Sequence, residues 1–244
     1  MTTRTLGDLG DTIAGRLITP EDEVFEEARR VYNAMIDRKP AALLRARNAD
    51  DVSQGIRFAR ANGLELAIRG GGHSVPGFGT VDDGLVIDLS EMREVTVDPV
   101  SRIATAAGGA TWGDFNDATH EHGLACTGGI VSTTGVGGLT LGGGIGYLAR
   151  GLGLSCDNLD SVEIVTAEGR VLTASEREHE DLFWAVRGGG GNFGVVTSFE
   201  FRLHPLKDVF AGPLFFAAAD AGDVLRFYRE LIADAPEEFG GFPA

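Results

Sequence analysis

Cysteine is scarce in this sequence of 244 residues, and its scarcity excludes several kinds of site. Only Cys126 and Cys156 occur, and they do not form a CxxC pair. Zinc sites and dithiol redox centres are built from such pairs, so we expect neither here, and no metal site of any kind. The two cysteines are predicted to be buried thiols, with a disulfide between them as the alternative.

Basic residues and long apolar runs are also few. The chain has 21 Lys and Arg against 36 Asp and Glu, which gives a net charge of -15. A chain this acidic is a poor partner for nucleic acid or an anionic membrane surface. It contains no run of about twenty apolar residues, so no membrane span is predicted. Residues 1–20 lack the continuous apolar segment of a signal peptide, and a cytoplasmic location is expected.

Glycine, in contrast, is abundant. The chain has 36 glycines, about twice the usual share. Many of them fall in four runs rather than in a regular repeat. This distribution is not typical of a collagen-like chain or a flexible linker. It predicts backbone that lies close against a ligand.

The first run, Arg69 to Ser74, reads Arg-Gly-Gly-Gly-His-Ser and follows a predicted strand at residues 64–68. Gly70, Gly71 and Gly72 expose bare N–H groups and allow close approach of a phosphorylated ligand. Arg69 adds a fork of donors suited to a diphosphate. His73 is then expected beside the ligand. The alternative is a tight turn that carries a solvated histidine.

The longest run covers residues 128–146, where nine of nineteen residues are glycine and no charged or aromatic side chain occurs. As a strand it would be weak, because glycine has no side chain to pack. We interpret it as backbone against a flat, partly polar ligand; close packing of a helix on a strand is the alternative. Its last five residues lack the strand–helix–strand context of a dinucleotide fingerprint, and no Walker lysine occurs, so both of those nucleotide folds are excluded.

Elsewhere the pattern predicts a mixture of helices and strands. Helices are expected at residues 20–32, 49–61, 111–122, 181–186 and 221–232. Strands are expected at residues 41–46, 64–68, 85–89, 94–97, 103–107, 195–203 and 210–217, with a hairpin at 162–173. Asn62 and Gly63 should end the second helix with a left-handed cap. Residues 1–19 are expected to be loosely held, and His120 and His122 to lie on the surface.

Five motifs in register resemble one family. They begin at Arg69, Asp83, Gly135, Asp157 and Asp181, the last reading Asp-Leu-Phe-Trp-Ala-Val-Arg-Gly-Gly-Gly-Gly-Asn-Phe-Gly-Val-Val-Thr. Together they resemble the FAD-linked oxidases of the berberine bridge enzyme type, in the superfamily of p-cresol methylhydroxylase and vanillyl-alcohol oxidase. The resemblance covers residues 31–205 and implies an α+β fold. It implies a two-subdomain FAD-binding domain at residues 1–206, followed by the start of a substrate domain at 207–244.

The resemblance also implies roles for individual residues. The loop from Arg69 to Ser74 would hold the FAD pyrophosphate, and His73 would be bonded covalently to the flavin. The ring and ribityl chain would lie along residues 129–140, and the adenine end would meet Gly194 and Val196. The remaining residues expected at the cofactor are Gly129, Val131, Thr134, Gly135, Gly138, Leu139, Thr140 and Gly144.

Two features depart from the family pattern. Some members attach the flavin a second time through a cysteine, but Val131 occupies that position, so a single attachment is expected. Family members also continue well beyond a length of 244 residues, and their catalytic base usually lies in that further part. No base can be named here, although Tyr147 either lines the flavin or is a packed tyrosine.

The implied function is that of an FAD-dependent oxidase. Such an enzyme moves a hydride from an alcohol, sugar, amine or other activated carbon to the flavin, and O2 reoxidises it. The alternative is a flavin-binding fragment or pseudoenzyme without turnover, because most of the substrate domain is missing. The strand at 210–217 and the apolar face of the last helix should then promote self-association. The substrate, the acceptor and the oligomeric state do not follow from the sequence.

Overall fold

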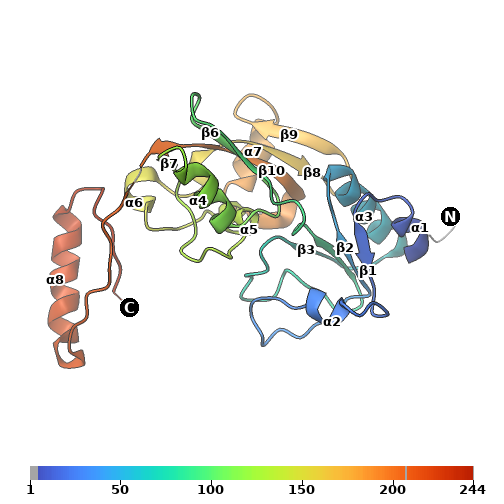
Figure 1. The fold of residues 1–244 in the computed structure, drawn as a ribbon, viewed down its shortest axis with the longest axis horizontal. Helices are drawn as coiled ribbons and strands as arrows, with labels where there is room; N and C mark the ends of the chain where they lie inside the picture. The colour runs from blue at the N-terminus through green and yellow to red at the C-terminus, as the bar shows by residue number, and fades with distance from the viewer. Residues whose placement is uncertain (1–4, 207, 244) are drawn as a thin grey trace.

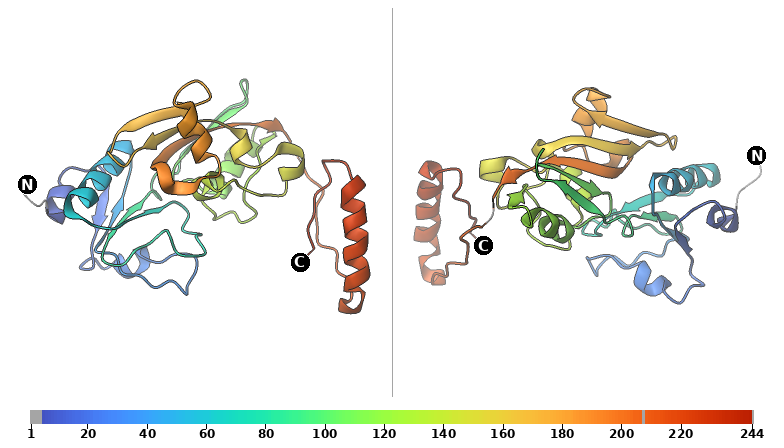
Figure 2. Two further views of the ribbon diagram at one scale, coloured as in Figure 1. Left: turned by 180° about the vertical axis from the view of Figure 1, so that it is seen from behind. Right: turned by 45° about the horizontal axis from the view of Figure 1, so that its top comes forward.

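The computed structural model describes residues 5–206 and 208–243, and it contains two sheets of different types (Figure 1). The first sheet is mostly parallel and the second is fully antiparallel. Helices pack on both sheets, which confirms the predicted α+β class. The C-terminal helix α8 (Ala221–Asp234) stands apart from both sheets in Figures 1 and 2.

The first sheet has four strands in the order β1-β2-β4-β3. They span Arg16–Ile18, Ala42–Arg45, Leu85–Asp88 and Leu66–Arg69. β2, β4 and β3 are parallel, so their carboxyl ends meet at one edge. β4 lies in the middle and is buried along its whole length. The glycine loop leaves β3 at this carboxyl edge, where ligand sites of parallel sheets commonly lie.

Helix α3 (Ala49–Asn62) covers one face of this sheet. It begins at Asn48, whose side chain accepts a hydrogen bond from the Asp51 N–H, and it ends at Gly63 with a φ of 65°. The left-handed cap predicted from the sequence is therefore confirmed. Val52, Ile56 and Ala59 are buried against the sheet, as the apolar spacing predicted.

The second sheet has five antiparallel strands in the order β5-β6-β10-β8-β9. They span Val95–Asp98, Ile103–Ala107, Val195–Arg202, Leu159–Val165 and Val171–Ser175. Phe199 and Phe201 on the central strand pack with Trp112 and Phe115 of helix α4 (Trp112–His120). Helices α5 (Val136–Leu141) and α7 (Glu180–Val186) contribute to the same core.

Helix α3, which covers the first sheet, is also hydrogen-bonded to the second sheet. The hydroxyl of Ser53 on α3 donates to the carbonyl oxygen of Gly169 at 2.7 Å. The guanidinium of Arg57, one turn further along α3, donates to the same oxygen at 2.8 Å. Gly169 lies in the turn between β8 and β9 and has a φ of 71°. The helix of one sheet is thus bonded to a hairpin turn of the other.

The remaining elements are short. They are α1 (Leu6–Gly10), α2 (Phe25–Ala28), α6 (Ala149–Leu152), the pair β7 (Leu124–Ala125) and β11 (His204–Pro205), and 3-10 turns at Cys156–Asn158, Gly190–Phe193 and Ala218–Asp220. Residues 5–19 were expected to be loosely held, yet β1 pairs with β2. The carboxylate of Asp51 also accepts from the Ala14 N–H at 2.7 Å. Residues 1–4 lie outside the described part of the chain.

Two predicted elements differ in the structure. The helix expected at residues 20–32 is only Phe25–Ala28, because the carbonyls of Ala28 and Arg30 accept from the buried Arg69 guanidinium and the chain turns away there. The strand expected at residues 210–217 forms no ladder. A strand needs a paired neighbour for its backbone groups, and none of the described strands lies beside it. Conversely, α5 was not predicted, since glycine disfavours helix.

Both cysteines are buried and unpaired, as predicted. Burial raises the pKa of the Cys126 thiol to about 12. His120 and His122 are exposed, also as predicted. Among the described residues no helix is both long and apolar enough to cross a bilayer.

Candidate functional site

The glycine loop presents a row of unused backbone donors. None of the N–H groups from Gly70 to Ser74 donates a hydrogen bond to another described residue. Gly72 has a φ of 71°, which a residue with a Cβ rarely adopts. Successive N–H groups in such a loop form a concave site for an anion. The backbone of the loop therefore leaves these N–H groups available to hydrogen-bond a ligand.

Arg69 does not add its charge in the way expected. Its side chain is buried, and its Nη2 donates to Asp88 Oδ2 and to the Ala28 carbonyl oxygen, both at 2.7 Å. Its Nη1 donates to the Arg30 carbonyl oxygen at 3.3 Å. The fork predicted to face a diphosphate is thus occupied by the protein. In this structure Arg69 anchors the base of the loop and the segment that follows α2.

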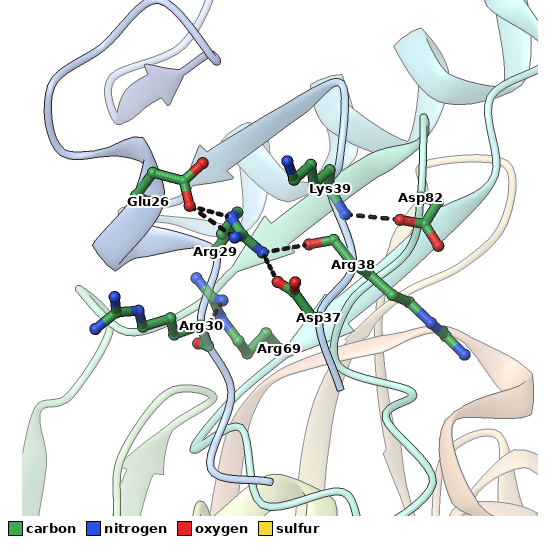
Figure 3. A network of polar contacts seen from close by, with 8 residues as sticks. All are labelled: Glu26, Arg29, Arg30, Asp37, Arg38, Lys39, Arg69 and Asp82. Atoms are coloured by element: carbon green, nitrogen blue, oxygen red, sulfur yellow. Dashed lines mark hydrogen bonds and ion pairs between the residues drawn. The ribbon is translucent and has the colours of Figure 1, made fainter. Parts of the chain in front are cut away.

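That segment, residues 28–38, is called the strap below, because it lies across the glycine loop. The N–H of Tyr32 donates to the Gly72 carbonyl at 3.1 Å, and the amide of Asn33 donates to the Val75 carbonyl at 3.0 Å. Figure 3 shows that Arg29, at the start of the strap, pairs with Asp37 near its end and with Glu26 of α2. Hydrogen bonding to Arg29 holds the pKa of the Asp37 carboxyl below its usual range. The strap is therefore fixed at both ends and at its middle.

His73 is held on two sides. Its Nε2 lies 2.9 Å from Thr133 Oγ1, and its Nδ1 lies 3.4 Å from Thr134 Oγ1. Its ring stacks on Tyr32, with centroids 4.0 Å apart and planes 18° from parallel. Partial burial lowers the pKa of the imidazole from its ordinary value. This shift favours the neutral imidazole, which carries a lone pair on one nitrogen.

Two loops meet beneath this histidine at a glycine pair. A Cβ on Gly71 would lie 2.2 Å from the Gly135 nitrogen, and one on Gly135 would lie 2.4 Å from the Gly71 nitrogen. Gly135 was predicted to be glycine so that a cofactor could approach. The structure gives a different reason, because the protein's own backbone fills that space. Gly135 also precedes α5, whose first turn lies next to the loop.

Along α5 the predicted residues point in different directions. Gly138 is exposed, and a Cβ there would meet nothing within 4 Å. Leu139 is partly buried, whereas Thr140 is fully buried with a hydroxyl that has no hydrogen-bond partner among the described residues. Of these residues Gly138 faces open space, and Thr140 faces the interior. Before the helix, Val131 is 40% exposed and Thr134 is half-buried.

Other predicted residues mainly serve packing in this structure. A Cβ on Gly129 would lie 3.0 Å from Trp112 Cδ1, and a Cβ on Gly144 would lie 2.3 Å from Ser155 Oγ. Gly194 has a φ of 148°, and a Cβ on it would meet the Val165 carbonyl at 2.4 Å. Tyr147 is 62% exposed, and its ring stacks on Phe242.

Tyr32 and Gly108 escaped the sequence reasoning, and Thr133 lay in the segment expected along the cofactor but was not singled out. Tyr32 and Thr133 contact His73, and Gly108 connects the loop to β10. The Gly108 oxygen lies 3.5 Å from a Cβ placed on Gly70, and a Cβ on Gly108 would lie 2.5 Å from the Val196 oxygen. The signal for Gly108 was its own glycine pair with Gly109. For Tyr32, far away in the chain, the sequence held none.

A cavity of about 280 Å³ lies between the strap and the glycine loop. Its wall includes Tyr32, Arg45, Arg69 and Asp88, besides the three glycines. A second cavity, of about 320 Å³, lies between residues 145–150 and 240–242, next to Tyr147. The loop thus has open space beside it that is bordered by charged and by backbone polar groups.

The sequence profile of a family described as "FAD binding domain" matches residues 40–175. A solved structure of 6-hydroxy-D-nicotine oxidase from Arthrobacter nicotinovorans is 37% identical, with a TM-score of 0.80, and the match covers 83% of this chain and 44% of that one. For the berberine bridge enzyme-like 1 protein (BBE-like 1) of Physcomitrella patens the identity is 31%, the TM-score 0.78 and the coverage 82% and 44%.

A glucooligosaccharide oxidase from Acremonium strictum, with a 6-S-cysteinyl, 8α-N1-histidyl FAD, is 33% identical with a TM-score of 0.73. That match covers 78% of this chain and 40% of the other. The chain spans about half the length of the curated relatives it matches.

Proposed function

Because the chain belongs to the FAD-binding domain family, we propose that it is the flavin-holding part of an FAD-dependent oxidoreductase. The resemblance to oxidases of the berberine bridge enzyme type is confirmed by its solved relatives. FAD is the cofactor of this family. Residues 1–206 would form the FAD-binding domain, and residues 207–244 would begin a substrate domain.

The described residues fit this cofactor. A dinucleotide diphosphate needs several donors at close range, and the unpaired N–H groups of Gly70 to Ser74 supply them without a side chain in the way. A flat ring needs a wall without projecting side chains, and the open position at Gly138 supplies it. The flavin ring and ribityl chain would follow residues 129–140, and the adenine would lie towards Gly194 and Val196. Arg69 would act indirectly, by holding the loop.

The covalent bond would run from His73 alone. The observation that carries this proposal is an imidazole held at the end of the donor row, between Tyr32 and Thr133. The relative from Acremonium strictum carries both a histidyl and a cysteinyl link. Val131 stands where a second link would need a thiol, and neither buried cysteine replaces it.

FAD supplies the hydride acceptor for oxidation of a carbon that bears an alcohol or an amine. The relatives point to two substrate classes, a nicotine derivative and oligosaccharides. We propose a small molecule of one of these classes as the donor and O2 as the final acceptor. The chain's part is to place the ring and to keep His73 in position, and the catalytic base stays unassigned.

Acid denaturation of the purified protein tests the attachment. Wild-type protein should retain yellow flavin on the polypeptide and show the mass of the chain plus FAD. His73→Ala should retain none, whereas His120→Ala, at an exposed histidine of α4, should behave as wild type. Flavin that stays on His73→Ala protein, or none on the wild type, would refute the proposal.

A second test concerns turnover and assembly. Oxygen consumption with a panel of sugars, alcohols and amines separates an oxidoreductase from a protein that only binds flavin. The wild type should consume O2 with at least one class; silence with all of them would favour the flavin-binding alternative. Residues 210–216 and α8 expose large apolar side chains, so we also propose self-association. Size-exclusion chromatography tests this proposal, and elution as a monomer at every protein concentration would contradict it.

A further inference from the structure

We infer that Tyr32 and Thr133 are positioning residues that hold the His73 ring on two sides and leave its Nδ1 as the atom that bonds the flavin. The inference rests on the proposed attachment of FAD to His73. It concerns Tyr32, for which the sequence motifs gave no role, and Thr133, which they placed along the cofactor without a role of its own. Both side chains are exposed, so their contacts with His73 are not by-products of a tightly packed core.

Thr133 makes the closer contact with one of the two ring nitrogens. Its Oγ1 lies 2.9 Å from Nε2, within the ordinary range of a good hydrogen bond, while Thr134 Oγ1 lies 3.4 Å from Nδ1. A hydroxyl can donate or accept, so Thr133 engages Nε2 in either tautomer and leaves Nδ1 with the weaker contact. Thr133 therefore favours Nδ1 as the nitrogen that remains available for attack.

Tyr32 decides the plane of the ring. Its ring is stacked on the imidazole, and its backbone N–H is bonded to Gly72, the residue before the histidine. The stacked ring thus belongs to the same rigid group as the loop, because the strap is anchored by Arg69 and closed by Arg29. No hydrogen bond of the Tyr32 hydroxyl occurs among the described residues, so the aromatic face is the part that matters.

The attachment balances as an oxidation of the methyl carbon. A C–N bond would form between Nδ1 and the methyl carbon of the flavin ring, and one methyl C–H bond would break. Its hydrogen would leave as a proton, and the two electrons would pass to the ring and from there to O2. Thr133 engages Nε2 at 2.9 Å, which favours attack from Nδ1. An imidazole free to rotate would lose this orientation, and orientation is a large part of the rate of such a step.

Four variants test the assignment, each as the full chain supplied with FAD. Thr133→Val removes the hydroxyl and keeps the shape, and Thr133→Ser restores the hydroxyl. Tyr32→Leu removes the stacked ring, and Tyr32→Phe restores it. Total FAD is measured before denaturation, and the covalent fraction is followed in time by acid precipitation and mass spectrometry. Peptide mapping with NMR identifies the bonded nitrogen.

We expect Thr133→Val and Tyr32→Leu to attach FAD about tenfold more slowly, which corresponds to loss of roughly one hydrogen bond or ring contact. Their total FAD should stay near the wild-type value, and Thr133→Ser and Tyr32→Phe should attach at the wild-type rate within about twofold. A merely structural role would lower total and covalent FAD together.

Three results would overturn the inference. They are wild-type attachment rates in Thr133→Val and Tyr32→Leu, parallel loss of total and covalent FAD in these variants, and a wild-type bond at Nε2. Wild-type protein that carries no covalent flavin at all would instead remove the proposed attachment, and this inference with it. The two failures are therefore distinguishable in one experiment.

Discussion

The two walls of the candidate site are built from the same residue type for different reasons. The glycine loop rests on buried charge, because Arg69 and Asp88 lie beneath it with side chains only 7% and 2% exposed. The second wall, which is the glycine-rich segment 128–146 that meets the loop at Gly135, rests on close neutral packing. There, a Cβ on Gly128 would lie 2.4 Å from the Trp112 ring, and one on Gly137 would lie 3.2 Å from the Phe199 ring.

Because of this difference, the two walls should tolerate different kinds of substitution. The first wall depends on a pair of opposite charges, so removing one partner leaves the other buried and uncompensated. The second depends on the lack of side-chain volume, so adding one carbon is harmful wherever the protein fills the space. Within this segment, only a Cβ on Gly138 would have no neighbour within 4 Å. Atoms added there should impair ligand binding without disturbing the protein's own packing. The predictions below test this division, beginning with the largest effect.

Replacing Asp88 should have the largest effect. Asp88→Asn leaves the buried Arg69 without its carboxylate, and we expect the free energy of unfolding to fall by about 3–5 kcal/mol. Urea unfolding measures the change. The matched control is Asp160→Asn, at a half-exposed pair with Arg202, which should cost less than about 1 kcal/mol. Equal effects in the two variants would mean that charge does not support the first wall.

Gly135→Ala should come next. The backbone angles of Gly135 are ordinary, so only the contact with Gly71 opposes the methyl group. We expect a loss of about 1–3 kcal/mol in unfolding free energy and loss of FAD as well. Gly10→Ala, where a Cβ meets nothing within 4 Å, serves as the control. A stable Gly135→Ala protein would show that the two loops can move apart at little cost.

Gly138→Val should affect the ligand but not the fold. The unfolding free energy of the protein without FAD should stay within about 0.5 kcal/mol of wild type, because the site is exposed. FAD content after purification should fall severalfold. The comparison of circular dichroism with flavin absorbance separates these effects. Loss of helix and flavin in equal measure would place Gly138 with the packed glycines.

The smallest effect should be a pH dependence that belongs to the first wall alone. The pKa of His73 is lowered in the folded protein, so the unfolded chain binds more protons as pH falls below about 7. The stabilising contribution of the neutral ring is present above the unfolded pKa and is lost as pH falls through the folded pKa. His73→Ala should therefore lose slightly less stability than wild type between pH 7.5 and 5.5 in urea unfolding. If the unfolding free energy of both proteins changed equally with pH, His73 would not contribute to the pH dependence of stability.

Much of the fold followed from the sequence where local signals agreed with tertiary packing. The helix at 49–62 carried its cap residues and its apolar face in the chain itself, and both were found. The helix at 20–32 failed because a single distant side chain, Arg69, captures the carbonyls that would have extended it. The prediction of a strand at 210–217 was wrong because a strand requires a paired neighbour, which the local sequence does not supply.

The site was predictable in outline and not in detail. Glycine runs indicate that the backbone closely approaches other atoms, but they do not distinguish a ligand from another part of the protein. Gly135 and Gly138 looked alike in the sequence, and only coordinates separate the crowded one from the open one. The partners of His73 come from the strap and from residue 133, and no spacing rule joins these distant parts of the chain.

The bond from α3 to the turn at Gly169 has a mechanical consequence. Two bodies joined at one point can pivot, whereas two joined at well-separated points cannot. The two sheets are connected at Ser53 and Gly169, through the shared core at Val165 and Val195, and at Gly71 and Gly135. Because these contacts are spread over the molecule, we expect a dinucleotide to displace loops and side chains without a hinge motion of the sheets. Amide hydrogen exchange should accordingly slow on FAD binding in the strap and the glycine loop, while exchange around residue 169 stays unchanged.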